Sequence, residues 1–286
     1  MIIGHQKIKD FFEKAIEKDK LAHAYCFSGL DSVGKKTFAY YLASRLLETS
    51  VEKLEKNVDF VLLERVKDKK TEQLKKEISI EQVRDLKSFL QNFSWGKTGR
   101  KIVIINEAEK LSSGASNSLL KILEEPGKGV YFFLITINAE FLLETIRSRC
   151  QLLYLSLVSN KDLENGLKEM GFSEKEIFLA IDCAAGVPGK AINFLNDSEY
   201  QNKAEKNKKV FSTILNSTLS ENFKMVEELI KEQKDFDKNN DLENQIDFWL
   251  KDSRNNLLAF LQSGDVNSLN KNFKFIDSAL RAKELL

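Results

Sequence analysis

Residues 24–47 read AYCFSGLDSVGKKTFAYYLASRLL, in which a short apolar run leads into a glycine loop and then into a helical pattern. The run Ala24–Ser28 predicts a buried strand, and the apolar spacing over Lys35–Leu47 predicts an amphipathic helix. A strand, a glycine loop and a helix in this order can bind phosphate, because backbone N–H groups and the helix N-terminus point at the same anion. This stretch therefore predicts an α/β fold built around a phosphate-binding loop.

The loop keeps three positions of the pattern G-x-x-x-x-G-K-[ST], namely Gly29, Gly34 and Lys35. Lys35 is expected to reach the β- and γ-phosphates of a nucleotide. The last position should carry a hydroxyl that binds magnesium, and here it is Lys36. Thr37 follows one residue later, which on a helix turns its hydroxyl about 100° away. The alternative interpretation is a glycine turn with a solvated lysine.

A second departure follows the apolar run Lys101–Ile105, which predicts a central strand. An aspartate at the next position would help to hold the same metal ion, and the chain has Asn106 there. Asn106 can hydrogen-bond a water molecule but brings no negative charge. Glu107 could polarise an attacking water or could be an ordinary carboxylate at a strand end. Both metal contacts are weakened, so the sequence predicts poor hydrolysis by this chain.

Strand and helix patterns alternate over the first 155 residues, which predicts a parallel sheet with helices on both faces. After about residue 156 the strand signals end and the pattern becomes helical. We therefore expect three parts: an α/β domain over residues 1–156, a small helical lid over 157–200, and an all-α domain over 201–286. The capping box at Ser79 and Gln82 predicts a helix start within the first part. The other strands are expected at Val58–Leu63, Val130–Ile135 and Leu152–Leu155, and the other helices at 6–18 and 112–125, with two or three short ones over 160–196.

The composition limits the classes of function. Among 286 residues, 42% are hydrophobic and the formal net charge is +1, so the chain can form packed cores and has no global attraction to nucleic acid. The three cysteines, Cys26, Cys150 and Cys183, are far apart, which argues against a cysteine-ligated zinc site and fits a reducing cytoplasm. No apolar run approaches a membrane span, so no membrane partner is expected. We expect no bound metal.

A third signal is the run Thr145–Cys150, which reads TIRSRC. Its arginines could be ordinary surface charges. Arginine can also stabilise phosphoryl-transfer charge when a neighbouring molecule supplies it in trans, because its guanidinium is planar and always charged. The residues alone leave both interpretations open.

Several motifs together carry a family resemblance. They are Gly4–Gln6, His23–Gly29 running into Gly34 and Lys35, Ile105–Leu111, Asn117–Pro126 and Thr145–Cys150. The set resembles the AAA+ clamp-loader family of bacterial DNA polymerase III, over roughly residues 1–195. The fold that this resemblance implies is an AAA+ phosphate-loop domain, a helical lid and a C-terminal collar for oligomerisation.

The resemblance also implies roles for particular residues. Arg149 matches an arginine finger that points into the ATP site of the neighbouring subunit, and Thr136 matches the first nucleotide sensor. The second-sensor arginine of ATP-hydrolysing members is replaced by Gly189. Together with Lys36 and Asn106, this favours the delta-prime type, a stator, over the gamma/tau motor type. The zinc-binding cysteines common in the family are also missing, so zinc is not expected.

The implied function is loading of a sliding clamp onto primed DNA in replication, with gamma/tau and delta types as partner subunits. DNA and the clamp would be reached through the complex. The implied nucleotide is ATP at a degenerate site, and whether it binds is left open. One alternative is an ATP-hydrolysing motor of the gamma/tau type, in which Thr37 and Glu107 rescue the metal chemistry. Another is an inactive scaffold whose arginine has no role.

Overall fold

The computed structural model describes residues 1–68, 71–94 and 96–202, and a few single positions between 250 and 281. The chain divides into two compact units, Met1–Lys190 and Ala191–Leu286. The expected all-α domain over 201–286 lies almost entirely outside the described residues, and the expected boundaries at 156 and 200 stay predictions.

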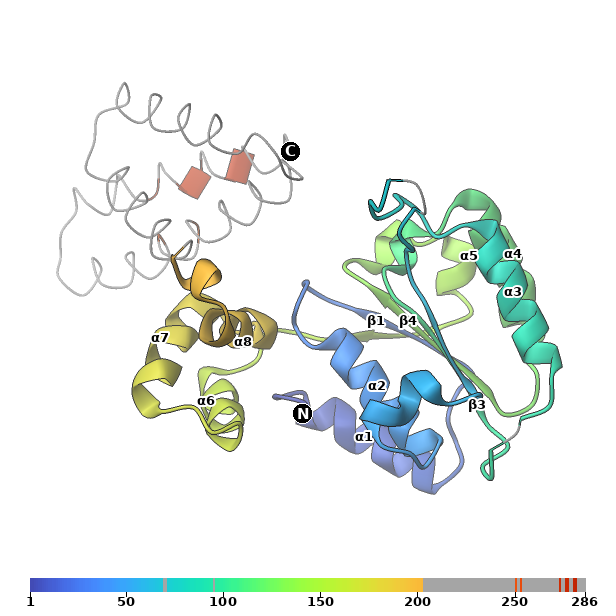
Figure 1. Cartoon of the computed structure of the whole chain (residues 1–286), viewed down its shortest axis with the longest axis horizontal. Coiled ribbons are helices and arrows are strands. Elements are labelled where there is room, and N and C mark those ends of the chain that lie inside the picture. The colour runs from blue at the N-terminus through green and yellow to red at the C-terminus, as the bar shows by residue number, and fades with distance from the viewer. Residues whose placement is uncertain are drawn as a thin grey trace. The chain divides into compact units, whose positions relative to one another are not determined.

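A five-stranded parallel sheet forms the centre of the first unit (Figure 1). Its strand order is β2-β3-β4-β1-β5, and every neighbouring pair is parallel, which confirms the predicted sheet. The strands are β1 (Ala24–Ser28), β2 (Phe60–Leu63), β3 (Lys101–Ile105), β4 (Val130–Thr136) and β5 (Gln151–Tyr154). β1 and β3 are buried at every position, as their continuous apolar sequences require in a sheet covered on both faces.

Helices cover both faces of this sheet. The predicted helices and the capping box at the start of α3 are confirmed. The α-helices are α1 (Gln6–Glu17), α2 (Lys35–Leu46), α3 (Ile80–Gln91), α4 (Ser113–Glu124), α5 (Glu144–Arg147), α6 (Asn160–Glu169), α7 (Glu174–Ala184) and α8 (Pro188–Asn196). The 3-10 helices are η1 (Val51–Lys56), η2 (Ala108–Lys110) and η3 (Ala139–Phe141). The sequence predicted neither η1 nor the four-residue α5, because neither is long enough to show an apolar period.

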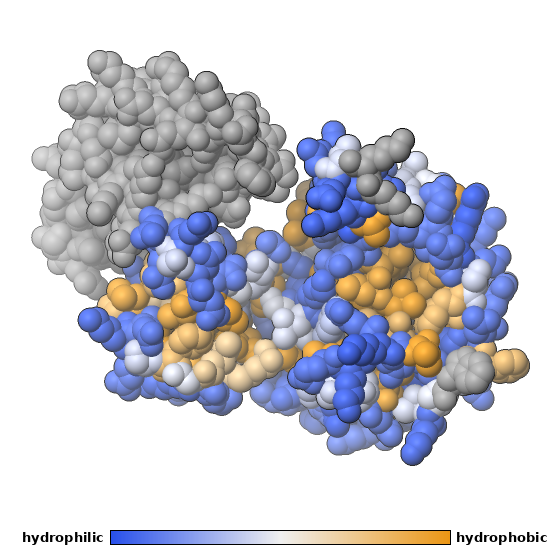
Figure 2. Space-filling model, viewed as in Figure 1, coloured by the Kyte–Doolittle hydropathy of each residue, from blue (hydrophilic) through white to orange (hydrophobic). Residues whose placement is uncertain are grey.

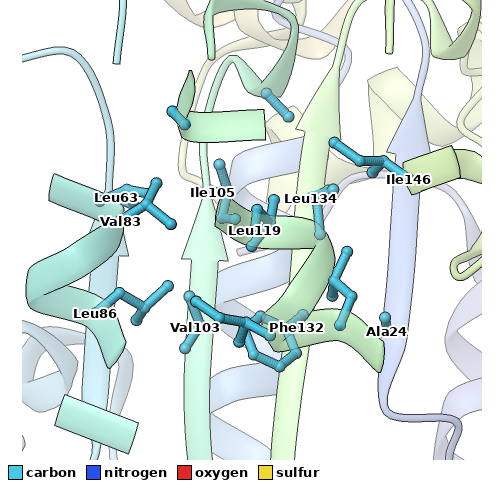
Figure 3. Close-up of a cluster of buried hydrophobic side chains, with 14 of the residues drawn as sticks. Ala24, Leu63, Val83, Leu86, Val103, Ile105, Leu119, Phe132, Leu134 and Ile146 are labelled. Carbon is cyan, nitrogen blue, oxygen red and sulfur yellow. The ribbon is translucent and has the colours of Figure 1, made fainter. Parts of the chain in front are cut away.

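Two apolar cores lie on opposite faces of the sheet. On one face α3 and α4 pack against alternate residues of β3 and β4, including Val103, Ile105, Phe132 and Leu134 (Figure 3). On the other face α1, α2 and η1 pack against the intervening residues, among which Phe133 is fully buried. Since successive strand residues point to opposite faces, each strand contributes to both cores.

The surface of the first unit is largely hydrophilic on the face that Figure 2 shows, with hydrophobic residues exposed in separate areas. In the part of the chain that the structure describes, no helix is long and apolar enough to cross a membrane.

The core on the α1 and α2 face of the sheet contains stacked aromatic rings. The ring of Phe133, on β4, stacks with two aromatic rings of the neighbouring strand β1. Its centroid lies 6.1 Å from the Tyr25 ring and 5.7 Å from the Phe27 ring. We predict that Phe133→Ala lowers the free energy of unfolding by about 3–5 kcal/mol, because it removes a fully buried ring and leaves a cavity. Hydrogen exchange of the β1 and β4 amides measures this loss. Phe93→Ala is the control, because Phe93 is 92% exposed and its loss should cost at most about 0.5 kcal/mol. Equal protection in the two variants would contradict the role given to Phe133.

Candidate functional site: a phosphate loop with an internal ion pair

The glycine loop joins β1 to α2 and can be explained position by position. A Cβ atom on Gly29 would lie 2.4 Å from the carbonyl oxygen of Leu155, so no larger residue fits. Gly34 has φ 108°, a backbone conformation that residues other than glycine rarely adopt. The loop backbone thus has the strand–turn–helix geometry expected of a phosphate site.

Lys35 is directed at its own loop. Its Nζ donates hydrogen bonds to the carbonyl oxygens of Gly29 at 2.6 Å and Leu30 at 2.7 Å. The side chain is buried, with only 6% of the residue exposed. Burial lowers the pKa of its ammonium, while the charges of Asp31 and Glu109 act in the opposite direction. In this arrangement the lysine that the motif would direct at phosphate closes the loop instead.

The residues that replace the magnesium ligands are joined by a third side chain. Lys36 Nζ lies 2.9 Å from Glu64 Oε2, and Asn106 Nδ2 donates to the same oxygen at 3.3 Å. The parallel register pairs Leu63 with Ile105, so Glu64 and Asn106 follow neighbouring strand ends. An ammonium and an amide nitrogen are hydrogen-bond donors and offer no lone pair to Mg²⁺. In the Lys36–Glu64–Asn106 cluster, as we call these three residues, the two positions that the motif gives to magnesium ligands thus carry an ammonium and an amide, and both donate to the Glu64 carboxylate.

Glu107, the candidate for polarising water, is also engaged. Arg65 binds it in a bidentate pair, with Nε to Oε2 at 2.8 Å and Nη2 to Oε1 at 2.7 Å. Such fork geometry is among the stronger protein ion pairs. It directs both carboxylate oxygens of Glu107 toward a guanidinium.

The remaining predicted nucleotide contacts differ in their surroundings. Thr136 ends β4 beside Ser28 and is buried, and its hydroxyl donates to the carbonyl oxygen of Asn138 at 2.9 Å. Thr37 is exposed on α2. It lines, with Lys36, a surface pocket of about 700 Å³ that the loop glycines and Lys35 do not line.

The loop is also held by segments far away in the sequence. The Gly189 N–H, in the first turn of α8, donates to the carbonyl oxygen of Ser32 at 2.9 Å. A Cβ atom on Gly189 would lie 2.8 Å from both the Cβ and the carbonyl oxygen of Ser32. His5 Nε2 lies 3.1 Å from the carbonyl oxygen of Val33. Gly189, the position matched to the second sensor, therefore contacts the loop through its backbone and leaves no room for an arginine.

Arg149 is not brought together with the loop. It follows α5, whose Ile146 packs in the core on the α3 and α4 face, whereas α2 packs on the opposite face. The side chain of Arg149 is 33% exposed, and its Nη2 lies 2.6 Å from Glu124 Oε1. Cys150 anchors the segment, and burial raises the pKa of its thiol to about 12. The arginine is therefore available at a surface distinct from the chain's own phosphate loop.

Comparison with known proteins assigns the chain to a protein family. The family model described as DNA polymerase III, delta subunit, matches residues 4–159. The chain belongs to this family. This confirms the resemblance found in the sequence, and curated delta-prime subunits support the delta-prime type. The Bacillus subtilis delta-prime subunit is 30% identical over 215 residues, which cover 73% of this chain and 64% of that protein. The Escherichia coli delta-prime subunit is 38% identical over 104 residues, covering 36% and 31%.

Other relatives of this chain carry other subunit names. The gamma subunit of Buchnera aphidicola from Schizaphis graminum is 29% identical over 224 residues, covering 71% of this chain and 58% of that protein. The chain thus spans about three fifths of the length of the first curated relatives. A crystal structure of a gamma-related protein from Thermotoga maritima has a TM-score of 0.51 at 16% identity and covers 95% and 99% of the two chains. That likeness supports the AAA+ fold.

Three residues of this delta-prime-like site were missed in the sequence: Glu64, Arg65 and Glu124. Glu64 could have been found, because it directly follows a strand that neighbours β3, and parallel strands end at one edge of the sheet. Arg65 and Glu124, the partners of Glu107 and Arg149, had no such signal, since surface charges have no period. Within the described residues no group of three or more His, Cys, Asp or Glu could hold a metal ion.

The contact between Gly189 and Ser32 can be tested. We predict that Gly189→Ala lowers the free energy of opening at this contact by about 1–3 kcal/mol, because the added methyl group overlaps the loop backbone. Hydrogen exchange of the residue 189 amide, which loses its protection, measures the effect. Gly114→Ala is the control: its Cβ would meet the end of the Ile80 side chain at 3.3 Å, away from the loop. Unchanged protection at residue 189 would show that the added methyl group does not disturb the hydrogen bond from residue 189 to Ser32.

Proposed function

We propose that this chain is a delta-prime-like subunit of a clamp loader. The chain itself would not hydrolyse ATP, and it would supply Arg149 to the ATP site of a neighbouring subunit. The observation that carries the proposal is the Lys36–Glu64–Asn106 cluster, in which an internal ammonium takes the place of a metal ligand. Loss of the metal contacts removes the charge neutralisation on which phosphoryl transfer depends. Lys36 and Glu107 thus form ion pairs within the chain, with Glu64 and Arg65 respectively. Arg149, by contrast, lies at the surface, where a neighbouring subunit could reach it.

Arg149 has the chemistry for a role in trans. Its guanidinium is always charged and can donate a fork of hydrogen bonds to phosphate oxygens. A finger of this kind increases phosphoryl-transfer rates by about 10³–10⁵-fold at the site it enters. The partner would be an ATP-hydrolysing subunit of the gamma/tau type. Proteins named gamma and tau subunits are among the relatives of this chain.

The rest of the assembly follows from the same proposal. The parts over residues 1–156, 157–200 and 201–286 would act as AAA+ domain, lid and collar, with the collar forming the ring with gamma/tau and delta types. Primed DNA and the sliding clamp would be contacted through the complex, in the cytoplasm. The phosphates of ATP would bind the loop backbone, and the positions of the usual magnesium ligands, Lys36 and Asn106, would bring no negative charge to a metal ion.

The alternative function is a motor of the gamma/tau type, and the intact Gly29, Gly34 and Lys35 favour it. Glu107 would then have to leave Arg65, and Thr37 would have to turn toward the metal. We expect purified chain to show no magnesium-dependent ATP hydrolysis above the rate of a Lys35→Ala control. Turnover that requires magnesium and is lost in Lys35→Ala would establish the motor and overturn the stator.

The role of Arg149 is tested in the assembled complex. We predict that Arg149→Ala lowers the ATPase rate of the neighbouring site by about 10³-fold or more, because the charge that stabilises the transition state is gone. Sites elsewhere in the complex keep their rates, so single-turnover measurements are needed to isolate the affected site.

Arg84→Ala is the matched control, since Arg84 is an exposed arginine on α3. Assembly is checked by gel filtration in both variants. Equal ATPase rates in Arg149→Ala and Arg84→Ala complexes would leave the chain as an inactive scaffold.

A further inference from the structure

Arg149 is held by two separate elements of the fold. Glu124, the last residue of α4, accepts from Nη2 at 2.6 Å. Thr145, within α5, accepts from Nη1 through its carbonyl oxygen at 2.8 Å, and Ser148 Oγ lies 3.5 Å from the same nitrogen. Because 24 residues separate Glu124 from Arg149 in the chain, this carboxylate connects the arginine to α4 in addition to its own segment.

The anchored guanidinium keeps donors to spare. Arginine has five N–H groups, and the three contacts use two on Nη1 and one on Nη2. The Nε–H and the second Nη2–H form no hydrogen bond with a described residue. Two donors on adjacent nitrogens are sufficient for a forked contact with phosphate oxygens.

We propose that Glu124 is a positioning residue for Arg149: its carboxylate orients the guanidinium before a neighbouring subunit arrives. This inference rests on the proposed function of Arg149 in trans. An arginine side chain has many rotamers, and immobilising one costs free energy at the moment it is ordered. Fixing Arg149 within the folded chain moves that cost from the subunit interface to folding.

A different role for the same contact would be storage, in which Glu124 holds Arg149 away from phosphate. The exposure of the pair favours positioning. The Glu124 side chain is 49% exposed, so its charge is hydrated and neutralises little of the arginine's charge. The carbonyl of Thr145 adds a second anchor that carries no net charge at all.

Variants in the assembled complex test the proposal, with ATP as substrate and the Arg149-dependent rate of the neighbouring site as the readout. Glu124→Gln keeps the shape of the side chain but removes its charge. We expect it to lower kcat about twofold to tenfold, the range that corresponds to ordering one flexible side chain, while KM for ATP stays within about twofold. Glu125→Gln is the matched control, since it neutralises the next carboxylate, which forms no ion pair with a described residue, and should leave kcat unchanged.

The double variant Glu124→Gln with Arg149→Ala separates positioning from a general structural effect. If Glu124 acts through Arg149, the double variant has the rate of Arg149→Ala alone. A further loss in the double variant overturns the proposal, because Glu124 would then act by another route. Should Glu124→Gln fail to assemble, Glu124→Asp, which keeps the charge but shortens the reach, takes its place with the same expectation.

The outcomes also separate this inference from the proposed function. An Arg149→Ala complex with normal ATPase overturns the function and this inference with it. A defective Arg149→Ala complex combined with an unchanged Glu124→Gln rate overturns only the positioning role. A Glu124→Gln rate above that of the unmodified complex overturns positioning as well, and identifies storage as the role of the ion pair.

Discussion

Parallel pairing of the five strands is the constraint on which the site depends. Because all strands run the same way, the residues that follow β1, β2, β3 and β4 meet at one edge of the sheet. The glycine loop, Glu64, Asn106 and Thr136 all owe their proximity to this geometry. Nucleotide sites of α/β proteins are built at this edge, so side chains here decide what the site can do.

At this edge the positions that the phosphate-loop motif gives to metal ligands take part in hydrogen bonds and ion pairs within the chain. A phosphate loop normally combines a hydroxyl and a carboxylate around magnesium. Here Lys36, on α2, brings a positive charge, and the carboxylate of Glu64, which follows β2, balances it. Arg65 does the same for Glu107. The charges of the site are thus satisfied within the protein, at a surface where exposed pairs contribute at most about 1 kcal/mol each to stability.

Sequence predicted the framework well because the framework is periodic or continuous. The apolar runs of β1, β3 and β4 indicated buried parallel strands, and the capping box at Ser79 located the start of α3. The loop positions Gly29, Gly34 and Lys35 were recognisable from spacing alone. The sequence did not predict that Lys35 would bind the loop carbonyls, nor the partners Glu64, Arg65 and Glu124, because contacts between polar side chains distant in sequence depend on the tertiary fold.

In the proposed function, internal side chains take the place of magnesium at the phosphate loop. Calorimetric titration of the purified chain with ATP, in the presence and absence of magnesium, tests it most directly. If the Lys36–Glu64–Asn106 cluster occupies the metal position, magnesium leaves the affinity for ATP unchanged or lowers it by competing for the triphosphate. An affinity that rises tenfold or more with magnesium, about 1.4 kcal/mol of binding free energy, would show that the loop still binds the metal ion.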